Sequence, residues 1–159
     1  MTGRQLAELI DEHAPALVLF ARQWCATPED VVQDSFCKLA SQRAVPDDAA
    51  AWLYRVVRNA AIDAGKSERR RLRREAVAAK AMPWFEEVAV DGLDATSAVA
   101  ALETLPVEQR EVIVARLWSG LTLQEIATVV GCSVSSAHRR FEAGIAALRE
   151  RLGVPCPKS

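Results

Sequence analysis

Residues 121–140 read LTLQEIATVVGCSVSSAHRR, and they carry the most specific structural signals in the chain. Thr122 and Glu125 have the spacing of a capping box, in which a hydroxyl and a carboxylate satisfy free amide groups at a helix start. Gly131 is suited to end that helix. The pattern predicts a short amphipathic helix whose buried stripe, at positions i, i+3, i+4 and i+7, consists of Leu123, Ile126, Ala127 and Val130.

A second helix is expected after the turn, with Ser133 as its cap. Donor side chains near its start suit base edges and phosphates in a major groove, although Arg139 and Arg140 could instead only solvate a surface helix. The capping residues, the turn and the placement of the donor side chains all fit the same motif, which favours a DNA-binding helix-turn-helix. The expected buried face comprises Val134, Ala137, Phe141, Ile145, Leu148 and Leu152, and the outer face Ser135, Arg139, Glu142 and Ala146, flanked by Ser136 and His138.

A further helix is expected upstream, where residues 105–113 read LPVEQREVI, with an early proline and acidic residues in the first turn. It should run to Gly120. Its apolar side chains, including Trp118, are expected to pack on the helix pair. Because apolar residues recur at spacings of three and four almost throughout the chain, without β-branched alternation, the predicted fold class is all-α.

Charge is distributed in blocks along the 159 residues, which carry a net charge of −1. Residues 55–80 hold nine basic and three acidic side chains, whereas residues 81–104 hold five acids and no base. The acidic stretch lacks a sustained period and is typical of a linker. The sequence therefore predicts two small helical domains, 1–80 and 102–159, joined by an acidic linker over 81–101.

Several classes of protein are disfavoured by what the sequence lacks. No apolar run approaches the roughly 18 residues of a membrane span, and the start lacks the basic-then-apolar order of a secretory signal, so a cytoplasmic protein is expected. The four cysteines form no C-x-x-C pair, and His13 and His138 lie far apart, so no metal site is expected. Without a phosphate loop or an activated nucleophile, neither enzymatic activity nor a cofactor is predicted.

In the N-terminal half, residues 28–36 read PEDVVQDSF and predict a helix capped by Thr27. Its buried stripe would be Val32, Phe36 and Leu39. An acidic outer face of this kind could simply be solvated. The outward residues are Asp30, Gln33, Asp34 and Cys37.

The next helix, introduced by Asp47 and Asp48, gathers aromatic, amide and cationic groups on one edge. Such a stripe can stack an unpaired base, bind its edge and hold the backbone. Trp52 could instead fill the core. Six cations with one acid follow over residues 66–74, and they repel one another unless a polyanion such as DNA is present. The stripe comprises Trp52, Arg55, Asn59, Asp63 and Lys66.

These strings together resemble a known family. The run from Leu105 through Thr122 and Glu125 to Arg140 resembles region 4 of bacterial sigma factors, notably the extracytoplasmic-function group. PEDVVQDSF resembles region 2.2, and WLYRVVRNAAID, residues 52–63, is similar to regions 2.3 and 2.4. The resemblance covers about residues 5–153 in the family's order and implies a subunit that directs core RNA polymerase to promoters.

The resemblance also implies roles for single residues. Region 2.2 docks on the clamp helices of the polymerase β′ subunit, which implies contacts from Asp30, Gln33 and Asp34. Regions 2.3 and 2.4 capture and open the minus-10 element, which implies Asn59 and Asp63 near the flipped base. The other implied minus-10 residues are Trp52, Arg55, Arg58 and Lys66; the DNA-backbone contacts are Arg69, Arg70, Arg116 and Arg140; and the minus-35 contacts are Ser135, Ser136, His138 and Arg139.

The implied partners are core RNA polymerase, through its β′ and β subunits, promoter DNA and an anti-sigma factor. The acidic linker corresponds to the segment that threads toward the polymerase active site, although a plain spacer fits equally well. Glu142 and Ala143 stand where many members have a basic residue, and His138 where Lys or Arg is common, which leaves the minus-35 preference open. The main rival is a free-standing helix-turn-helix regulator that acts without polymerase, and a more distant one is a helical adaptor.

Overall fold

The computed structural model describes residues 2–75 and 100–153, and the regular elements in these two ranges are all helices. The predicted all-α class is therefore confirmed. Most of the expected acidic linker, residues 81–99, lies outside the described residues. The helices are α1 Gly3–Ala21, α2 Pro28–Ala40, α3 Ala49–Glu75, α5 Val107–Leu117, α6 Leu123–Val130 and α7 Val134–Leu152.

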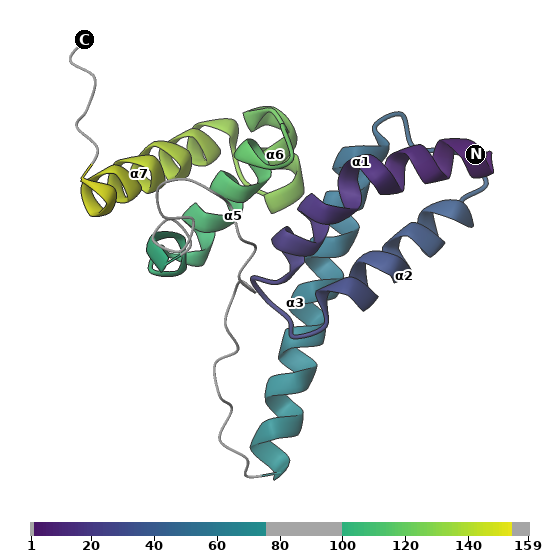
Figure 1. The fold of residues 1–159 in the computed structure, drawn as a ribbon, viewed down its shortest axis with the longest axis horizontal. Coiled ribbons are helices and arrows are strands. Elements are labelled where there is room, and N and C mark those ends of the chain that lie inside the picture. Colours follow the sequence, from purple (N-terminus) through teal and green to yellow (C-terminus); the bar gives the residue numbers. More distant parts are fainter. Residues whose placement is uncertain (1, 76–99, 154–159) are drawn as a thin grey trace.

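The three N-terminal helices pack on one another around an aromatic centre (Figure 1). Phe20 on α1 meets Trp24 and Tyr54 edge-on, with ring centroids 5.0 and 5.2 Å away, the arrangement that aromatic rings prefer. The apolar faces of α2 and α3 close over this centre. The buried residues include Leu17, Val31, Val32, Phe36, Leu39, Leu53, Val57 and Ala61, so the predicted stripe of α2 is confirmed.

Gly65 allows α3 to pass close to the chain that follows α1. A Cβ atom at this position would overlap the backbone carbonyl of Trp24, which has no freedom to swing aside. Beyond Gly65, α3 continues past the body of the molecule, as the descending helix in Figure 1 shows. The approach at Gly65 therefore brings α3 against the chain after α1 just before the turns that extend past the body of the molecule.

α6 and α7 form the predicted helix-turn-helix, and α5 packs against both. The Thr122 hydroxyl accepts a hydrogen bond from the Glu125 amide at 3.2 Å, and Glu125 accepts one from the Thr122 amide at 2.6 Å. Gly131 has a φ of 74°, the left-handed conformation in which glycine commonly ends helices. The Ser133 hydroxyl caps α7 by accepting a hydrogen bond from the amide of Ser136 at 3.1 Å. The capping box, turn and second cap are therefore confirmed.

Several expectations about the C-terminal helices are wrong. α5 ends at Leu117 rather than at Gly120, and both Leu117 and Trp118 are about half exposed, at 57% and 47%. Val134 and Leu152, expected on the buried face of α7, are exposed as well. The reason is length, because α7 spans about 28 Å whereas α6 spans about 12 Å, so the ends of α7 extend beyond the helices that cover its middle.

The start of α2 also differs from expectation. Thr27 occupies the cap position, but its side chain makes no capping hydrogen bond. Pro28 at the first helical position has no amide hydrogen, so one of the donors that a cap would satisfy is absent. By contrast, Asp48 accepts a hydrogen bond from the Ala51 amide at 2.8 Å, as expected for the start of α3.

The two groups of helices pack against each other. α3 lies against α6 and α1 against α5, as Figure 1 shows. Tyr54 of α3 is fully buried, and its hydroxyl lies near that of Ser119, which follows α5. The apolar core consequently continues from the N-terminal helices into the C-terminal ones.

Candidate functional site

The outer face of α2 carries acidic and amide groups beside an apolar groove. Asp30, Gln33 and Asp34 are all exposed, while the opposite face of the helix is buried. The groove between α1 and α2 has a volume of about 340 Å³, and Gln33 is one of its lining residues. The predicted docking residues therefore lie together on one accessible surface with both polar and apolar parts.

The α3 stripe lies as the sequence predicts. Arg55, Asn59 and Asp63 are exposed at successive turns, and Asp63 forms an ion pair with Lys66 at 3.8 Å. Trp52 is half-buried and packs against the core, so part of its ring fills the interior while part stays accessible. The stripe thus presents an amide, three charges and an aromatic edge on one side of the helix.

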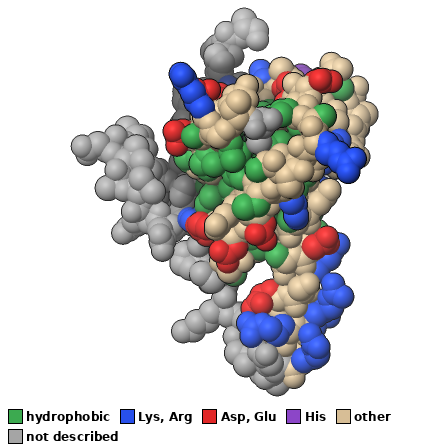
Figure 2. Space-filling view, turned by 90° about the vertical axis from the view of Figure 1, so that its right-hand side faces the viewer, with side chains coloured by type: hydrophobic (Ala, Val, Ile, Leu, Met, Phe, Trp, Pro, Cys, Tyr) green, Lys and Arg blue, Asp and Glu red, His purple; other side chains and the backbone are tan. Residues whose placement is uncertain are grey.

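A cationic hollow lies on the extending part of α3. Figure 2 shows basic side chains gathered along this projection. The hollow has a volume of about 230 Å³, and its lining residues are Lys66, Arg69, Arg70 and Arg73. Arg71 instead donates to Glu68 at 2.7 Å, and this hydrogen bond lowers the pKa of the Glu68 carboxyl. Four close cations form a site suited to phosphate.

The first turns of α7 hold most of the residues predicted for duplex recognition. Ser135, His138 and Arg139 are exposed. Ser136 belongs to the cap, because its hydroxyl lies 2.9 Å from that of Ser133 and accepts from Arg139 at 3.3 Å. The start of α7 therefore carries a set of linked donors on its outer side.

Arg116 lies at the entrance to the helix-turn-helix. It is exposed, and it donates to the Leu121 carbonyl at 2.8 Å. This bond ties the end of α5 to the residue before the Thr122 cap. Its guanidinium group therefore remains beside the start of α6.

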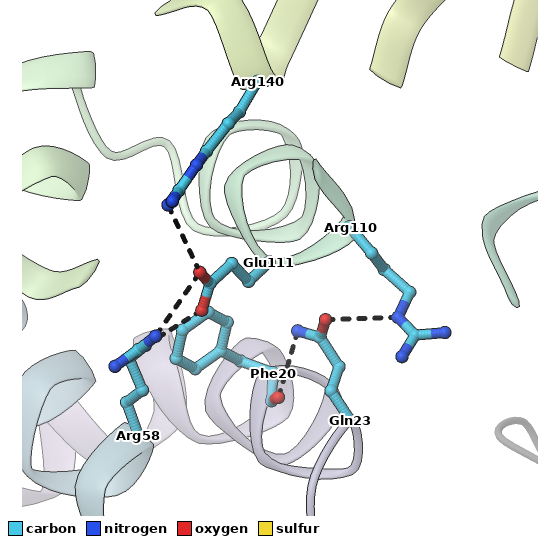
Figure 3. A network of polar contacts seen from close by, with 6 residues as sticks. All are labelled: Phe20, Gln23, Arg58, Arg110, Glu111 and Arg140. Atoms are coloured by element: carbon cyan, nitrogen blue, oxygen red, sulfur yellow. Dashed lines mark hydrogen bonds and ion pairs between the residues drawn. The ribbon is translucent and has the colours of Figure 1, made fainter. Parts of the chain in front are cut away.

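Arg58 and Arg140, both predicted DNA contacts, meet at one buried carboxylate (Figure 3). Arg58 donates to both oxygens of Glu111, at 2.9 and 3.4 Å, while Arg140 lies 3.8 Å from the second oxygen. The Glu111 side chain is 2% exposed, against 21% for Arg58 and 34% for Arg140. In this arrangement the two guanidinium groups point at Glu111.

The surroundings of Glu111 set its protonation and hold Arg58. Burial raises the pKa of the Glu111 carboxyl, and the hydrogen bond and charge of Arg58 oppose that rise. Arg58 also lies 5.7 Å from the centre of the Trp24 ring, within reach of a cation–π interaction. Sequence reasoning did not single out Glu111, although its spacing of three and four from Val114 and Ala115 places it on the buried face of α5.

A second polar link joins α5 to the end of α1 (Figure 3). Gln23 donates to the Phe20 carbonyl at 3.1 Å and accepts from Arg110 at 3.4 Å. Arg110 also donates to the Glu103 carbonyl at 3.2 Å, and burial lowers the pKa of its guanidinium group. The two halves of the chain therefore meet through polar side chains as well as through apolar ones.

Within residues 2–75 and 100–153, no group of three or more His, Cys, Asp or Glu side chains is placed to hold a metal ion. In the same part of the chain, none of the helices has the length and apolar character that crossing a membrane requires. Cys25 and Cys132 are half-buried and Cys37 is exposed. Burial raises the pKa of the Cys25 thiol.

Comparison with protein families gives two matches on this chain. Residues 9–71 match sigma-70 region 2, and residues 96–148 match sigma-70 region 4. The first range covers the helices with the α2 and α3 surfaces, and the second covers the helix-turn-helix. Together they define a sigma-70 type transcription initiation factor, the class of protein that directs RNA polymerase to promoters.

Curated relatives and solved structures agree with these matches. The ECF RNA polymerase sigma factor SigL of Mycobacterium tuberculosis is 32% identical, over 92% of this chain and 89% of the relative. SigE of Mycolicibacterium smegmatis is 28% identical, over 95% of this chain and 65% of the relative. The chain therefore belongs to the extracytoplasmic-function group of sigma-70 factors, and the resemblance seen in the sequence is confirmed.

Two solved structures share the fold over nearly the whole chain. The sigma factor RpoE, in complex with the anti-sigma factor NepR from Bartonella quintana, has a TM-score of 0.75 and 25% identity, covering 98% of this chain and 100% of that one. CnrH, in complex with the cytosolic domain of CnrY, has a TM-score of 0.63 and 26% identity, covering 98% and 92%. These likenesses extend over both groups of helices.

Proposed function

We propose that the chain docks on core RNA polymerase through α2, holds the melted minus-10 element along α3, and reads the minus-35 duplex with α7. One observation carries this division of labour: the candidate surfaces lie on separate helices whose opposite faces form the core. Most side chains on these surfaces are exposed and available for contacts, whereas Arg58 and Arg140 are paired with Glu111. The proposed domains are residues 1–80 and 102–159, with 81–101 as the linker.

For polymerase docking, the proposed contacts are Asp30, Gln33 and Asp34. Their exposed acid and amide groups would meet basic side chains of the β′ clamp helices, a contact that steers and orients more than it adds affinity. The adjoining groove between α1 and α2 supplies apolar area for the same interface.

For the minus-10 element, Asn59 and Asp63 are proposed to bind the edge of a flipped base, with the accessible part of Trp52 beside it. Arg55 and Arg58 would hold phosphates, and Lys66 would continue that contact along α3. The cationic hollow supports this path, since Arg69 and Arg70 extend the same side of the helix toward the DNA backbone.

For the minus-35 element, the exposed start of α7 is proposed to enter the major groove. Ser135, Ser136, His138 and Arg139 would face the base edges and their flanking phosphates. Arg116 and Arg140 would hold the DNA backbone on either side. The hydrogen bonds that link Ser133, Ser136 and Arg139 support this placement, because they hold the Ser136 and Arg139 side chains relative to the helix axis.

The chain is further proposed to act in the cytoplasm and to perform no covalent chemistry of its own. RpoE and CnrH occur in complexes with an anti-sigma factor and with the cytosolic domain of CnrY, respectively. On that basis an anti-sigma factor is a proposed partner of this chain, alongside the β′ and β subunits and promoter DNA.

Run-off transcription with core polymerase on a promoter library tests the proposal directly. The chain should cosediment with core polymerase and support initiation on a subset of templates. A chain that bound duplex DNA tightly by itself while ignoring core polymerase would instead be a free-standing regulator, and the proposal would be wrong.

Replacing Asp34 with Lys tests the docking surface on α2. The side chain is exposed, so helicity should be unchanged, while binding to core polymerase should weaken about tenfold because an acidic contact becomes repulsive. Asp11→Lys makes the same charge change at an exposed position on α1 and serves as the control. Equal holoenzyme formation by both variants, measured by fluorescence anisotropy with labelled chain, would remove Asp34 from the docking surface.

A further inference from the structure

A buried carboxylate links the first and last helices of the C-terminal group. The Glu111 side chain on α5 is 2% exposed, and one of its oxygens lies 3.8 Å from a guanidinium nitrogen of Arg140 on α7. Both residues belong to the group formed by α5, α6 and α7, so their pairing does not depend on how that group packs against the N-terminal helices. The pair is therefore internal to the unit that is proposed to read the minus-35 element.

Arg140 starts from the face of α7 that packs on α5. Ala137 and Gly144 stand three residues before it and four residues after it, which places all three on one side of the helix. Ala137 and Gly144 are buried, and a Cβ atom at position 144 would overlap the end of the Ile113 side chain on α5. Two small residues therefore bring α7 close to α5, and Arg140 stands between them with its charge directed at Glu111 (Figure 3).

The ion pair restricts the contact between these helices in a way that apolar packing does not. Apolar attraction is non-directional, whereas a carboxylate buried as deeply as Glu111 must keep a cationic partner, because an unpaired charge there is costly. Burial raises the pKa of the Glu111 carboxyl, and the hydrogen bond and charge of Arg58 and the charge of Arg140 oppose that rise. A buried pair of this kind specifies an arrangement more than it stabilises the fold.

The arrangement of α7 matters because hydrogen bonds to base edges are directional. Ser135, His138 and Arg139 are exposed on the outer side of α7. We propose that Glu111 is a positioning residue for minus-35 recognition, which holds Arg140 against α5 and so sets the orientation at which α7 presents these donors. Arg140 directs one nitrogen at Glu111, so its other donors remain available for the backbone contact proposed above. This inference rests on the proposed function, which makes α7 the helix that reads the minus-35 element.

The test replaces Glu111 with Gln, which keeps the shape of the side chain and removes its charge. Holoenzymes assembled with core polymerase are titrated with two fragments of one promoter that supports initiation, the first with its minus-35 element intact and the second with that element scrambled. The ratio of the two affinities isolates the reading of the minus-35 sequence, because every other contact is common to both fragments. Glu108→Gln makes the same change at an exposed position one turn earlier on α5 and is the control.

E111Q should reduce this ratio about tenfold, the effect of misplacing one good base contact, whereas E108Q should keep the wild-type ratio. The scrambled fragment is held mainly through its phosphates, by charge attraction that depends less on direction, so affinity for it should change little. A variant that merely folds less well would lose affinity for both fragments equally. An unchanged ratio in E111Q would therefore overturn the proposal.

Variants of the two arginines show through which partner Glu111 acts. Arg140→Met removes the charge and keeps the length of the side chain, so it should lower the ratio as E111Q does, and adding E111Q to it should cause no further loss. Arg58→Met should weaken binding to both fragments, because Arg58 is a proposed minus-10 contact, and it should keep the wild-type ratio. A ratio lowered as much by R58M as by E111Q, or a full further loss in the double variant, would refute action through Arg140.

The wild-type result distinguishes this inference from the proposed function. A wild-type holoenzyme that binds both fragments equally would refute the proposed reading of the minus-35 element, and the positioning role with it. A wild-type preference for the intact fragment that E111Q retains in full would leave the proposed function standing and refute only the positioning role of Glu111.

Discussion

Tyr54 is the single tyrosine of the chain, and its environment can be read by titration. Burial raises its pKa to about 12, and the neighbouring Ser119 hydroxyl opposes that rise only in part. A raised value means that the folded state prefers the neutral phenol. The corresponding stability is fully present below about pH 10 and is lost as the pH rises through about 12.

We therefore expect alkaline pH to unfold the chain as Tyr54 ionises. Near-ultraviolet absorbance should show tyrosinate forming with a midpoint close to 12, together with loss of helicity by circular dichroism. The same titration in urea, where the ring is solvated, should have its midpoint near 10. A midpoint near 10 without urea would mean that the junction around Tyr54 is open in solution.

Asn59 provides a second test at a single position. Its side chain is exposed, so Asn59→Ala should leave the fold intact and impair open-complex formation more than closed-complex binding. Permanganate footprinting and gel-shift titration measure the two steps. Gln42→Ala removes an exposed amide after α2 and is the matched control. Equal loss in both steps would make Asn59 a general DNA contact rather than a base-specific one.

Sequence periodicity located exposed residues such as Asn59 well, because their exposure depends on their own helix. It could not place the partners of Arg58. The position of Arg58 beside Glu111 depends on how α3 meets α5, and Glu111 lies 53 residues further along the chain. The prediction that Trp118 is buried was wrong for a related reason. Its side chain lies past the end of α5, where the helical period no longer applies.

At the scale of elements, the crossing of α3 past the end of α1 depends on Gly65. Gly65→Ala should destabilise the chain by about 1–3 kcal/mol, because the new Cβ meets the Trp24 backbone and one element must shift. Gly3→Ala, where a Cβ meets nothing within 4 Å, is the control. Urea unfolding followed by circular dichroism measures the difference. Equal stability of the two variants would show that α3 can move aside without cost.

Helix starts were more predictable than helix lengths. The box at Thr122 and the cap at Ser133 are formed by residues three apart, so a short stretch of sequence specifies them completely. Where α5 ends, and whether the ends of α7 are buried, depend instead on which neighbouring helices extend far enough to cover these residues. Val134 and Leu152 fit a helical stripe but lie beyond the cover that the shorter helices provide.

At the scale of the whole molecule, a net charge of −1 conceals a strongly basic projection. Arg69→Ala combined with Arg70→Ala should weaken the salt dependence of holoenzyme binding to promoter DNA. The slope of log K against log salt should become shallower by about 1.4–1.8 units, the value for two lost phosphate contacts. Arg149→Ala with Arg151→Ala removes the same charge from exposed sites near the end of α7. A slope equally changed in both double variants would indicate a general effect of net charge.

The division into two helical halves followed from composition, because charge and periodicity change together near residue 81. The packing of the two halves against each other could not be predicted from composition. It depends on a few cross-domain contacts, such as Tyr54 beside Ser119 and Gln23 beside Arg110, and no periodic pattern in the chain encodes such pairs. The described fold was therefore predictable within each half, and the junction between the halves was not.

The pairing at Glu111 has a consequence for how the protein distributes itself inside a cell. A chromosome offers an enormous number of non-specific sites, and attraction to them scales with the cations a protein exposes. Because the single Glu111 carboxylate offsets one of the two guanidinium charges beside it, a molecule in this arrangement is less prone to become trapped on bulk genomic DNA. More of the pool then stays free to diffuse, so one buried acid influences how quickly a newly made molecule can find polymerase.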